Sequence, residues 1–412
     1  MKSKMAILLI IVFLFNGLND SRQLNDLSII SAIGVDIDEN GEYIITSQVL
    51  NTQKADNSSG SASGGTSVVV YETKKKSIHE ALRDTIEKAS KKLYIAHLEL
   101  LLVSEEAAQK DILSIMDFFL RDNEGSSNFM VVIAKDDKPQ EILSTLSAIN
   151  PDPAKSIFQS IKSTYEFEGC TTDYLVYDTL EMVLNDKCGS VFASISLDKH
   201  EGDSQDPKSS SNQESGLECG MTSSGSDTSS SSEASTNRFK VTELAYFKDN
   251  KFIGYMDKND AIVYNLFKNE LESTVLSVGE DDNLITVEVK KSKAKLIPKF
   301  ENGNYTIDID VKIDANVTEV GKEVRENISE NHEKYNEKIE DIITGKINDA
   351  IYNYKYKYEE DIVGFECIIY KKLNKQYDRE NFKDKYFKNM ITNVNVKVNF
   401  PLEGSDMVDG RT

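Results

Sequence analysis

The spacing of apolar residues changes near residue 320, and this change constrains the fold more than any other feature of the sequence. Between residues 271 and 318 apolar and polar residues alternate, and the alternating stretches are 273–278, 284–292, 295–301 and 305–318. Alternation interrupted by Gly and Asp predicts a meander of strands. From 320 to 358 the apolar residues recur at helical spacing instead. The sequence therefore predicts an α+β domain over residues 271–405, with one long helix at 320–358.

Similar signals upstream predict two further domains, at 20–150 and 151–270. A chain of 412 residues has the length of two or three domains. The expected fold class is α+β, with three consecutive domains, each a mixed or antiparallel sheet with packed helices. The expected strands are 27–35, 43–49, 68–71, 98–103, 129–134, 190–197, 240–247, 251–256 and 394–400, and the expected helices are 77–92, 105–120, 138–146, 173–184 and 258–269.

Two segments separate these elements. Pro151-Asp152-Pro153 marks the expected boundary between the first and middle domains. Residues 199–237 are rich in Ser, Gly and Asp and contain almost no large apolar residue. Such a segment cannot bury enough apolar surface to offset the entropy of ordering. We therefore predict a disordered Ser-rich insertion within the middle domain.

The first 18 residues form a signal-like apolar segment. Lys2 and Lys4 precede the apolar run Met5–Phe15. A short basic start followed by a short apolar run is typical of a secretory signal, whereas a membrane span needs about 20 apolar residues. The chain is therefore expected to act outside the cytoplasm. Cleavage and retention of this segment both stay open.

Charge and motifs narrow the classes of function. The formal net charge of −21 disfavours binding to nucleic acid and to anionic lipid headgroups. No motif for a nucleophile, a phosphate loop, a dinucleotide or zinc occurs in the sequence. Of the histidines only His97 is expected to be buried, in a structural role. We predict no catalytic, cofactor-binding or metal-binding residues, and a protein that is not an enzyme.

Three smaller features have local interpretations. Asp308 and Asp310 are expected on the solvated face of a strand. The tyrosine-rich stretch 352–358 either faces a partner or packs its alternate side chains on the sheet. Of the four cysteines, Cys170 and Cys188 are the one pair near enough in sequence to suggest a disulfide, and their pairing stays open.

Four stretches resemble the Ger(x)C family, the C subunits of nutrient germinant receptors. Near the N-terminus, Gly17, Asp20, Arg22 and the stretch Leu24–Leu27 fit the start of the mature family members. A second match is distributed over about 50 residues, and it comprises His97, Ala108, Ile112, Phe118, Phe119, Leu120, Arg121, Asp122 and Glu124. The text LAYFKDNKFIGYMD at 244–257 is similar to the start of the family's C-terminal region. Asp361–Phe365 resembles the motif Asp-Ile-x-Gly-Phe-Gly, with Glu366 in place of the last Gly.

The resemblance implies a function and a location. It implies a non-enzymatic C subunit that is needed for spore germination in response to nutrients, with membrane-embedded A and B subunits as partners. The expected location is the outer face of the spore inner membrane. Leu18 occupies the position of the family's lipidated Cys, so no lipid anchor is expected there, and attachment is expected to be peripheral or weak. The alternative is an extracytoplasmic solute-binding protein, which would need a polar cleft between domains.

Overall fold

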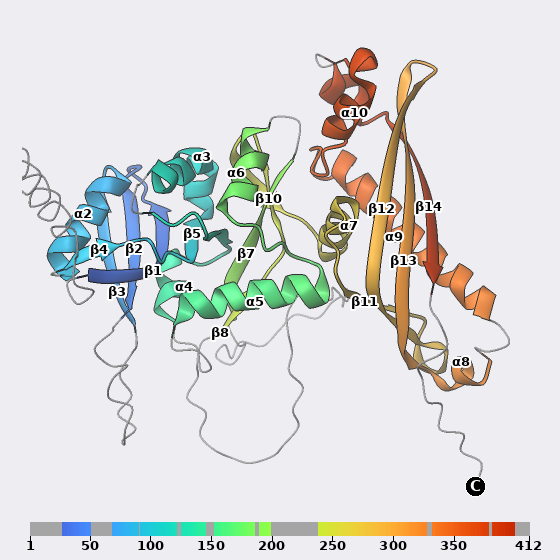
Figure 1. The fold of residues 1–412 in the computed structure, drawn as a ribbon, viewed down its shortest axis with the longest axis horizontal. Helices are drawn as coiled ribbons and strands as arrows, with labels where there is room; N and C mark the ends of the chain where they lie inside the picture. The colour runs from blue at the N-terminus through green and yellow to red at the C-terminus, as the bar shows by residue number, and fades with distance from the viewer. Residues whose placement is uncertain are drawn as a thin grey trace, which may run out of the picture.

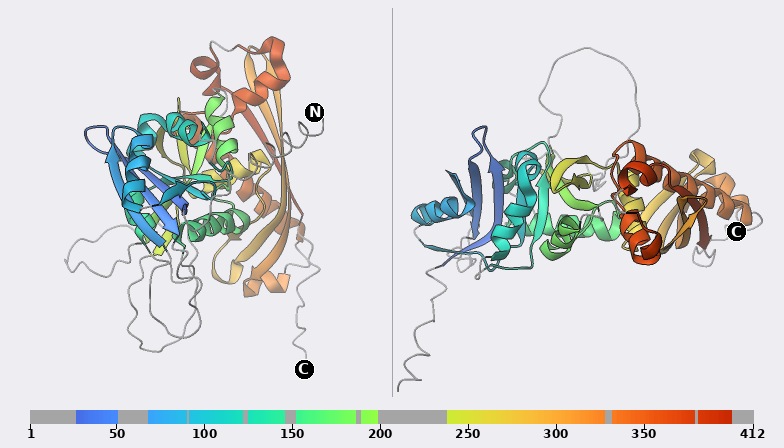
Figure 2. Two further views of the ribbon diagram at one scale, coloured as in Figure 1. Left: turned by 60° about the vertical axis from the view of Figure 1, so that its left-hand side comes forward. Right: turned by 90° about the horizontal axis from the view of Figure 1, so that it is seen from above.

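The computed structural model describes residues 27–50, 68–89, 91–121, 125–145, 152–185, 189–198, 238–327, 332–378 and 381–399. The segments 1–18 and 199–237, which include Leu18 and Cys219, lie outside the described residues, and so does Cys188. Within the described part the chain forms two sheets, which lie toward opposite ends of the molecule (Figure 2).

The first sheet has ten strands in the order β10-β9-β7-β6-β5-β1-β2-β3, with β4 paired to β1 and β8 paired to β7. Its middle is parallel, because β1, β5, β6 and β7 run in one direction, and its flanking pairs are antiparallel. The strands are β1 Leu27–Ile37, β2 Tyr43–Leu50, β3 Val68–Lys75, β4 Lys92–Tyr94, β5 Leu100–Ser104, β6 Met130–Ala134, β7 Ser190–Asp198, β8 Arg238–Val241, β9 Ala245–Lys248 and β10 Lys251–Tyr255.

Helices cover both faces of this sheet. Leu101 and Val103 belong to a core that includes residues of α2, α3 and α6, whereas Leu100 and Leu102 belong to a second core with α4 and α5. Successive side chains of a strand point to opposite faces, so the continuous apolar run in β5 fits a strand that is buried on both sides. The helices are α2 Ile78–Ala89, α3 Glu105–Arg121, α4 Pro139–Ser144, α5 Pro153–Glu168 and α6 Val176–Leu184.

The second sheet has four strands in the order β11-β12-β13-β14. The first three are antiparallel neighbours, and β14 runs parallel to β13. These strands are β11 Thr274–Val278, β12 Ile285–Glu301, β13 Asn304–Val320 and β14 Ile391–Asn399. The helices of this part are α7 Lys258–Lys268, α8 Lys322–Asn327, α9 His332–Tyr356 and α10 Phe365–Leu373, followed by a π-helical turn, η5, at Phe382–Phe387. Figure 1 shows α7 between β10 and β12.

The α+β class is confirmed, but one part of the expected arrangement is wrong. Strands β7 to β10 continue the first sheet, so residues 151–270 do not form a separate sheet. Hydrogen bonds between strands distant in sequence decide this membership, and no local pattern encodes them. The division into three domains stays a prediction.

Other expected elements differ in their extent. The stretches 284–292 and 295–301 form the single strand β12. The helix expected at 320–358 is described as α8 and α9, and residues 328–331 between them are outside the described residues. Helix α5 was not predicted, because Pro153 suggested a boundary. Pro is compatible with the first turn of a helix, and Asp152 caps α5 by accepting a hydrogen bond from the Ala154 N–H at 3.1 Å.

Candidate functional site: the junction between the two sheets

The residues that sequence reasoning examined for chemistry do not assemble into a reactive site. Among the residues that the structure describes, no group of three or more His, Cys, Asp or Glu could hold a metal ion. His97 is exposed, which contradicts the expected burial: the apolar neighbours Ile95 and Leu98 fill the core and leave the imidazole to solvent. No helix in the described ranges is long and apolar enough to cross a membrane.

The cysteines are buried where they are described. Cys367 is free and buried. Cys170 is buried and disulfide-bonded, and its partner is outside the described residues. The alternative pairings of Cys170 therefore stay open.

A dense polar arrangement lies at the junction of the two sheets, and it begins with the loop before α10. Asp361 is buried and its carboxylate accepts three backbone hydrogen bonds: Oδ1 from the N–H groups of Gly364 at 3.0 Å and Phe365 at 2.8 Å, and Oδ2 from that of Glu366 at 2.7 Å. The side chain thereby caps α10. Gly364 has φ 79°, a left-handed conformation that favours glycine. The stretch 361–365 is thus a helix-capping loop.

This loop packs directly on the first sheet. A Cβ atom on Gly189, which immediately precedes β7, would lie 2.4 Å from the Cα and 2.5 Å from the carbonyl oxygen of Ile362. The backbones are so close that only glycine fits at this position. Glu360 adds ion pairs on either side, at 3.3 Å to Lys248 of β9 and 3.2 Å to Lys383 of η5. The loop therefore joins both parts of the molecule.

Helix α7 forms the second part of the junction through a buried carboxylate. Asp260 is 1% exposed. It accepts hydrogen bonds from the Tyr358 hydroxyl at 2.5 Å and the Asn353 amide at 3.0 Å, and its carbonyl accepts one from the Tyr354 hydroxyl at 2.5 Å. Burial raises the pKa of Asp260, and the two side-chain hydrogen bonds oppose this shift. These contacts fix α7 against the end of α9.

Tyr358 extends this network to the first sheet. Its ring lies 5.1 Å from that of Tyr246 on β9, measured between centroids. Its hydroxyl accepts a hydrogen bond from the Asp257 N–H at 3.0 Å. A single side chain therefore contacts β9, the start of α7 and the buried Asp260, and it couples the two parts of the fold.

The opposite side of α7 holds the turn that follows α5. Asn265 is fully buried and its amide donates to the carbonyls of Gly169 at 2.8 Å and Thr171 at 2.7 Å. Nearby, the Tyr174 hydroxyl donates to the Glu270 carboxylate, and burial raises the pKa of Glu270. Helix α7 is thus held by polar side chains on two sides, with an apolar core around it.

The junction was only partly visible in the sequence. The stretch 361–365 was identified by resemblance alone, because the usual capping position directly precedes a helix, whereas Asp361 lies four residues before the first residue of α10. Asp260 and Asn265 were missed, because a helical stretch with polar residues on several sides is expected to face solvent. Their burial depends on the contact with distant segments.

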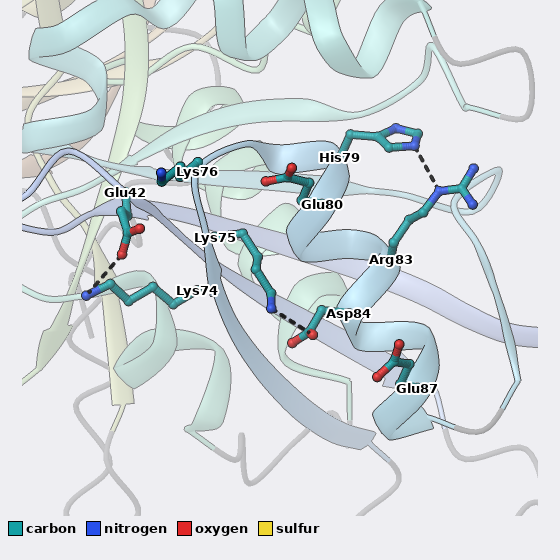
Figure 3. A pocket seen from close by; sticks show the side chains of 9 residues that line it. All are labelled: Glu42, Lys74, Lys75, Lys76, His79, Glu80, Arg83, Asp84 and Glu87. Atoms are coloured by element: carbon teal, nitrogen blue, oxygen red, sulfur yellow. Dashed lines mark hydrogen bonds and ion pairs between the residues drawn. The ribbon is translucent and has the colours of Figure 1, made fainter.

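A surface depression lies beside α2 and is lined by residues of both charges: Glu42, Lys74, Lys75, Lys76, His79, Glu80, Arg83, Asp84 and Glu87 (Figure 3). Within it Lys75 pairs with Asp84 at 3.1 Å, and the Lys74 ammonium holds the pKa of the neighbouring Asp38 at about 2. Because cations and carboxylates neutralise one another there, we interpret it as a solvated surface.

The tyrosine-rich stretch combines the two alternatives considered from the sequence. Tyr354 and Tyr358 are buried in the junction, whereas Tyr352 and Tyr356 are 62% and 48% exposed and their ring centroids are 4.8 Å apart. Residues four apart share one face of a helix, so Tyr352 and Tyr356 form an exposed aromatic pair on α9.

A second exposed apolar face lies on α6, where Tyr177 and Leu184 are 59% and 64% exposed.

Fold and junction define a class of protein: an α+β chain whose two sheets are locked together by a buried polar network. Comparisons with known proteins identify the family to which this chain belongs. A family model described as spore germination protein N-terminal domain matches residues 20–195, and one described as spore germination B3/GerAC like, C-terminal, matches residues 242–400. The chain belongs to the Ger(x)C family of spore germination proteins.

Individual relatives agree with this assignment. Spore germination protein KC of Bacillus subtilis (strain 168) is 24% identical over 409 residues, which cover 96% of this chain and 94% of that protein. Spore germination protein A3 of the same organism is 30% identical over 125 residues, 30% of this chain and 33% of that protein. The crystal structure of the GerBC protein has a TM-score of 0.54 at 15% identity, with 92% of this chain and 99% of that one covered, and it shows the same fold.

Proposed function

We propose that this chain is the non-enzymatic C subunit of a nutrient germinant receptor and is needed for germination in response to nutrients. The observation that carries the proposal is the match of both halves of the chain to spore germination family models. The family descriptions and the names of the relatives are those of spore germination proteins, not of enzymes.

The junction supports a scaffold rather than a hinged receptor for small molecules. Solute-binding proteins take up ligands in a cleft and commonly close around them by a hinge between domains. Here the Asn265 amide on α7 donates hydrogen bonds to the carbonyls of Gly169 and Thr171 after α5, so buried polar contacts cross from one part of the fold to the other. Moving one sheet relative to the other would break these hydrogen bonds. The structure thus favours a rigid body that docks on partners.

Deletion of the gene from the spore-forming host tests the proposal. In a strain without redundant receptors, spores that lack this chain should keep their refractility and retain dipicolinate when exposed to nutrients. Reintroduction of the intact gene should restore both responses. If the deleted strain germinates as fast as its parent, the proposed function is wrong.

The proposal includes membrane-embedded A and B subunits as partners at the outer face of the spore inner membrane. With Leu18 at the position of the lipidated Cys, attachment should depend mainly on those subunits. Fractionation of spore membranes from strains with and without A and B checks this. Full retention without the partners, with an intact N-terminus by mass spectrometry, would show that the apolar segment is a sufficient anchor.

The alternative, a solute-binding protein, has its own test. Calorimetric titration of the chain with amino acids should give no saturable heat if the scaffold proposal is correct. A clear saturable signal would favour the alternative.

A further inference from the structure

The outer face of the C-terminal sheet carries an ordered pattern of charge. Along β13 the residues Ile309, Val311 and Ile313 are buried in the core with α7, α9 and α10, whereas the residues between them point to the other face. Lys312 lies on this outer face and is exposed. The outer face is polar and lies in a solvated part of the molecule.

Two rows that run across the strands of this face have the same composition. In one, Lys295 of β12 is opposite Asp310 of β13, which accepts a hydrogen bond at 3.2 Å from Asn395 of β14. In the other, Lys291, Asp314 and Asn399 repeat the order, again with 3.2 Å between amide and carboxylate. Each row therefore has a carboxylate in the middle, beside a lysine and an amide.

The row between them consists of lysines alone. Lys293 of β12 is opposite Lys312 of β13, which is opposite Lys397 of β14, on three adjacent strands (Figure 1). We call these three residues the lysine row. Like charges directly opposite one another destabilise a sheet. Lys397 reaches Glu340 at 3.3 Å around the edge of the sheet, but Lys293 and Lys312 have no ion pair within the described ranges.

Repulsion between the opposed lysines therefore acts against the stability of the isolated chain. The lysine row also concentrates positive charge on a chain whose net charge is −21. A partner that places carboxylates opposite the row would relieve this repulsion. Such a partner also has to accommodate Asp310 and Asp314 on both sides of the row.

This alternation identifies the kind of partner. Residues on one face of a strand are about 7 Å apart along the strand. An anionic membrane would bring negative charge over the lysines and the aspartates alike and would be repelled by the latter. A folded protein can present acidic side chains to the row and basic ones beside them. We propose that the lysine row docks on an acidic protein surface, and, on the basis of the proposed function, that this surface belongs to the A or B subunit.

The substitution Lys312→Glu tests this inference, because it has opposite effects on stability and on binding. It changes the row to alternating signs, so the melting temperature of the isolated chain should rise by about 2 °C. Co-purification with the A and B subunits, all three co-expressed, should fall about tenfold. The matched control is Lys338→Glu on α9, which changes the charge equally at an exposed position. It should affect neither quantity.

The outcomes separate the inference from the function on which it rests. If the unaltered chain does not co-purify with A and B, the proposed function fails, and the inference fails with it. If the unaltered chain co-purifies and Lys312→Glu retains the same yield, the inference alone is overturned. Binding of the chain to phosphatidylglycerol vesicles that is lost in Lys312→Glu would overturn the protein partner in favour of a membrane.

Discussion

Replacing the buried Asp361 by Ala should destabilise the C-terminal part of the protein more than a carboxylate-to-alanine change at an exposed position. The side chain accepts three backbone hydrogen bonds, at 2.7, 2.8 and 3.0 Å, and it is 5% exposed. Water therefore cannot readily replace the lost acceptor. Asp361→Asn is the informative partner variant, because its amide oxygen can still accept two of the three bonds.

The magnitude follows from the count of donors. Loss of a helix cap costs about 1 kcal/mol, and each buried N–H left without an acceptor costs about 1–3 kcal/mol. Because the loop can partly relax around the alanine, we expect Asp361→Ala to lower the free energy of unfolding by about 3 kcal/mol, which is less than the full sum of these costs. For Asp361→Asn we expect about 1 kcal/mol, because one N–H faces the amide nitrogen. At pH 5 the order of stability should be Asp, Asn, Ala.

Urea unfolding followed by circular dichroism measures these differences. Asp341→Ala, at an exposed position of α9, is the control and should lie within about 0.5 kcal/mol of the unaltered chain. Equal free energies of unfolding for Asp361→Ala and the unaltered chain would refute the capping role. Equal losses for Asn and Ala would show that the retained oxygen makes no hydrogen bonds.

Three further predictions concern the junction. Burial raises the pKa of Asp361 to about 7, although its three N–H donors oppose this shift. The stabilising contribution of the protonated side chain is therefore fully present below about pH 4 and is lost as the pH rises through about 7. Between pH 5 and 8 the free energy of unfolding of the unaltered chain should fall relative to that of Asp361→Asn by roughly 2–3 kcal/mol, and a constant difference would contradict this. Gly189→Val places a Cβ 2.4 Å from the Cα of Ile362 in the loop before α10, and it should lower the free energy of unfolding by at least about 2 kcal/mol in thermal unfolding. The matched variant Gly345→Ala, at an exposed position of α9 with nothing within 4 Å of the added Cβ, should raise it by about 0.5 kcal/mol. Tyr354→Phe removes a buried hydroxyl and should cost about 1 kcal/mol in urea unfolding, and Tyr352→Phe, at an exposed position, should be neutral; the reverse order would exclude the proposed network.

Local sequence patterns were sufficient to predict most of the helices and strands. The helix expected at 77–92 corresponds to α2, and it begins where the Ser77 hydroxyl accepts a hydrogen bond from the Glu80 N–H at 3.2 Å. The alternation at 305–318 corresponds to β13, and the turn at 248–250 joins β9 to β10. Each of these depends on residues within a few positions of one another, so periodicity and turn residues were enough.

The candidate site shows where such local reasoning stops. The stretch 361–365 was recognisable in the sequence, but its contact with Gly189 joins residues far apart in the chain. Asp260 and Asn265 look like exposed helix residues, and they are buried because α7 lies between two sheets. The opposite error occurred at His97, which is exposed because its apolar neighbours fill the core.

The sequence by itself therefore determined most of the strands and helices, and the family, because these reside in short patterns or in matches along the chain. Tertiary structure alone decided that β7 to β10 join the first sheet and that three lysines share one row. Both depend on strand register, and a shift of one residue would place Lys312 in the core. Register is set by the packing of the whole sheet on its helices, which no single segment of the sequence encodes.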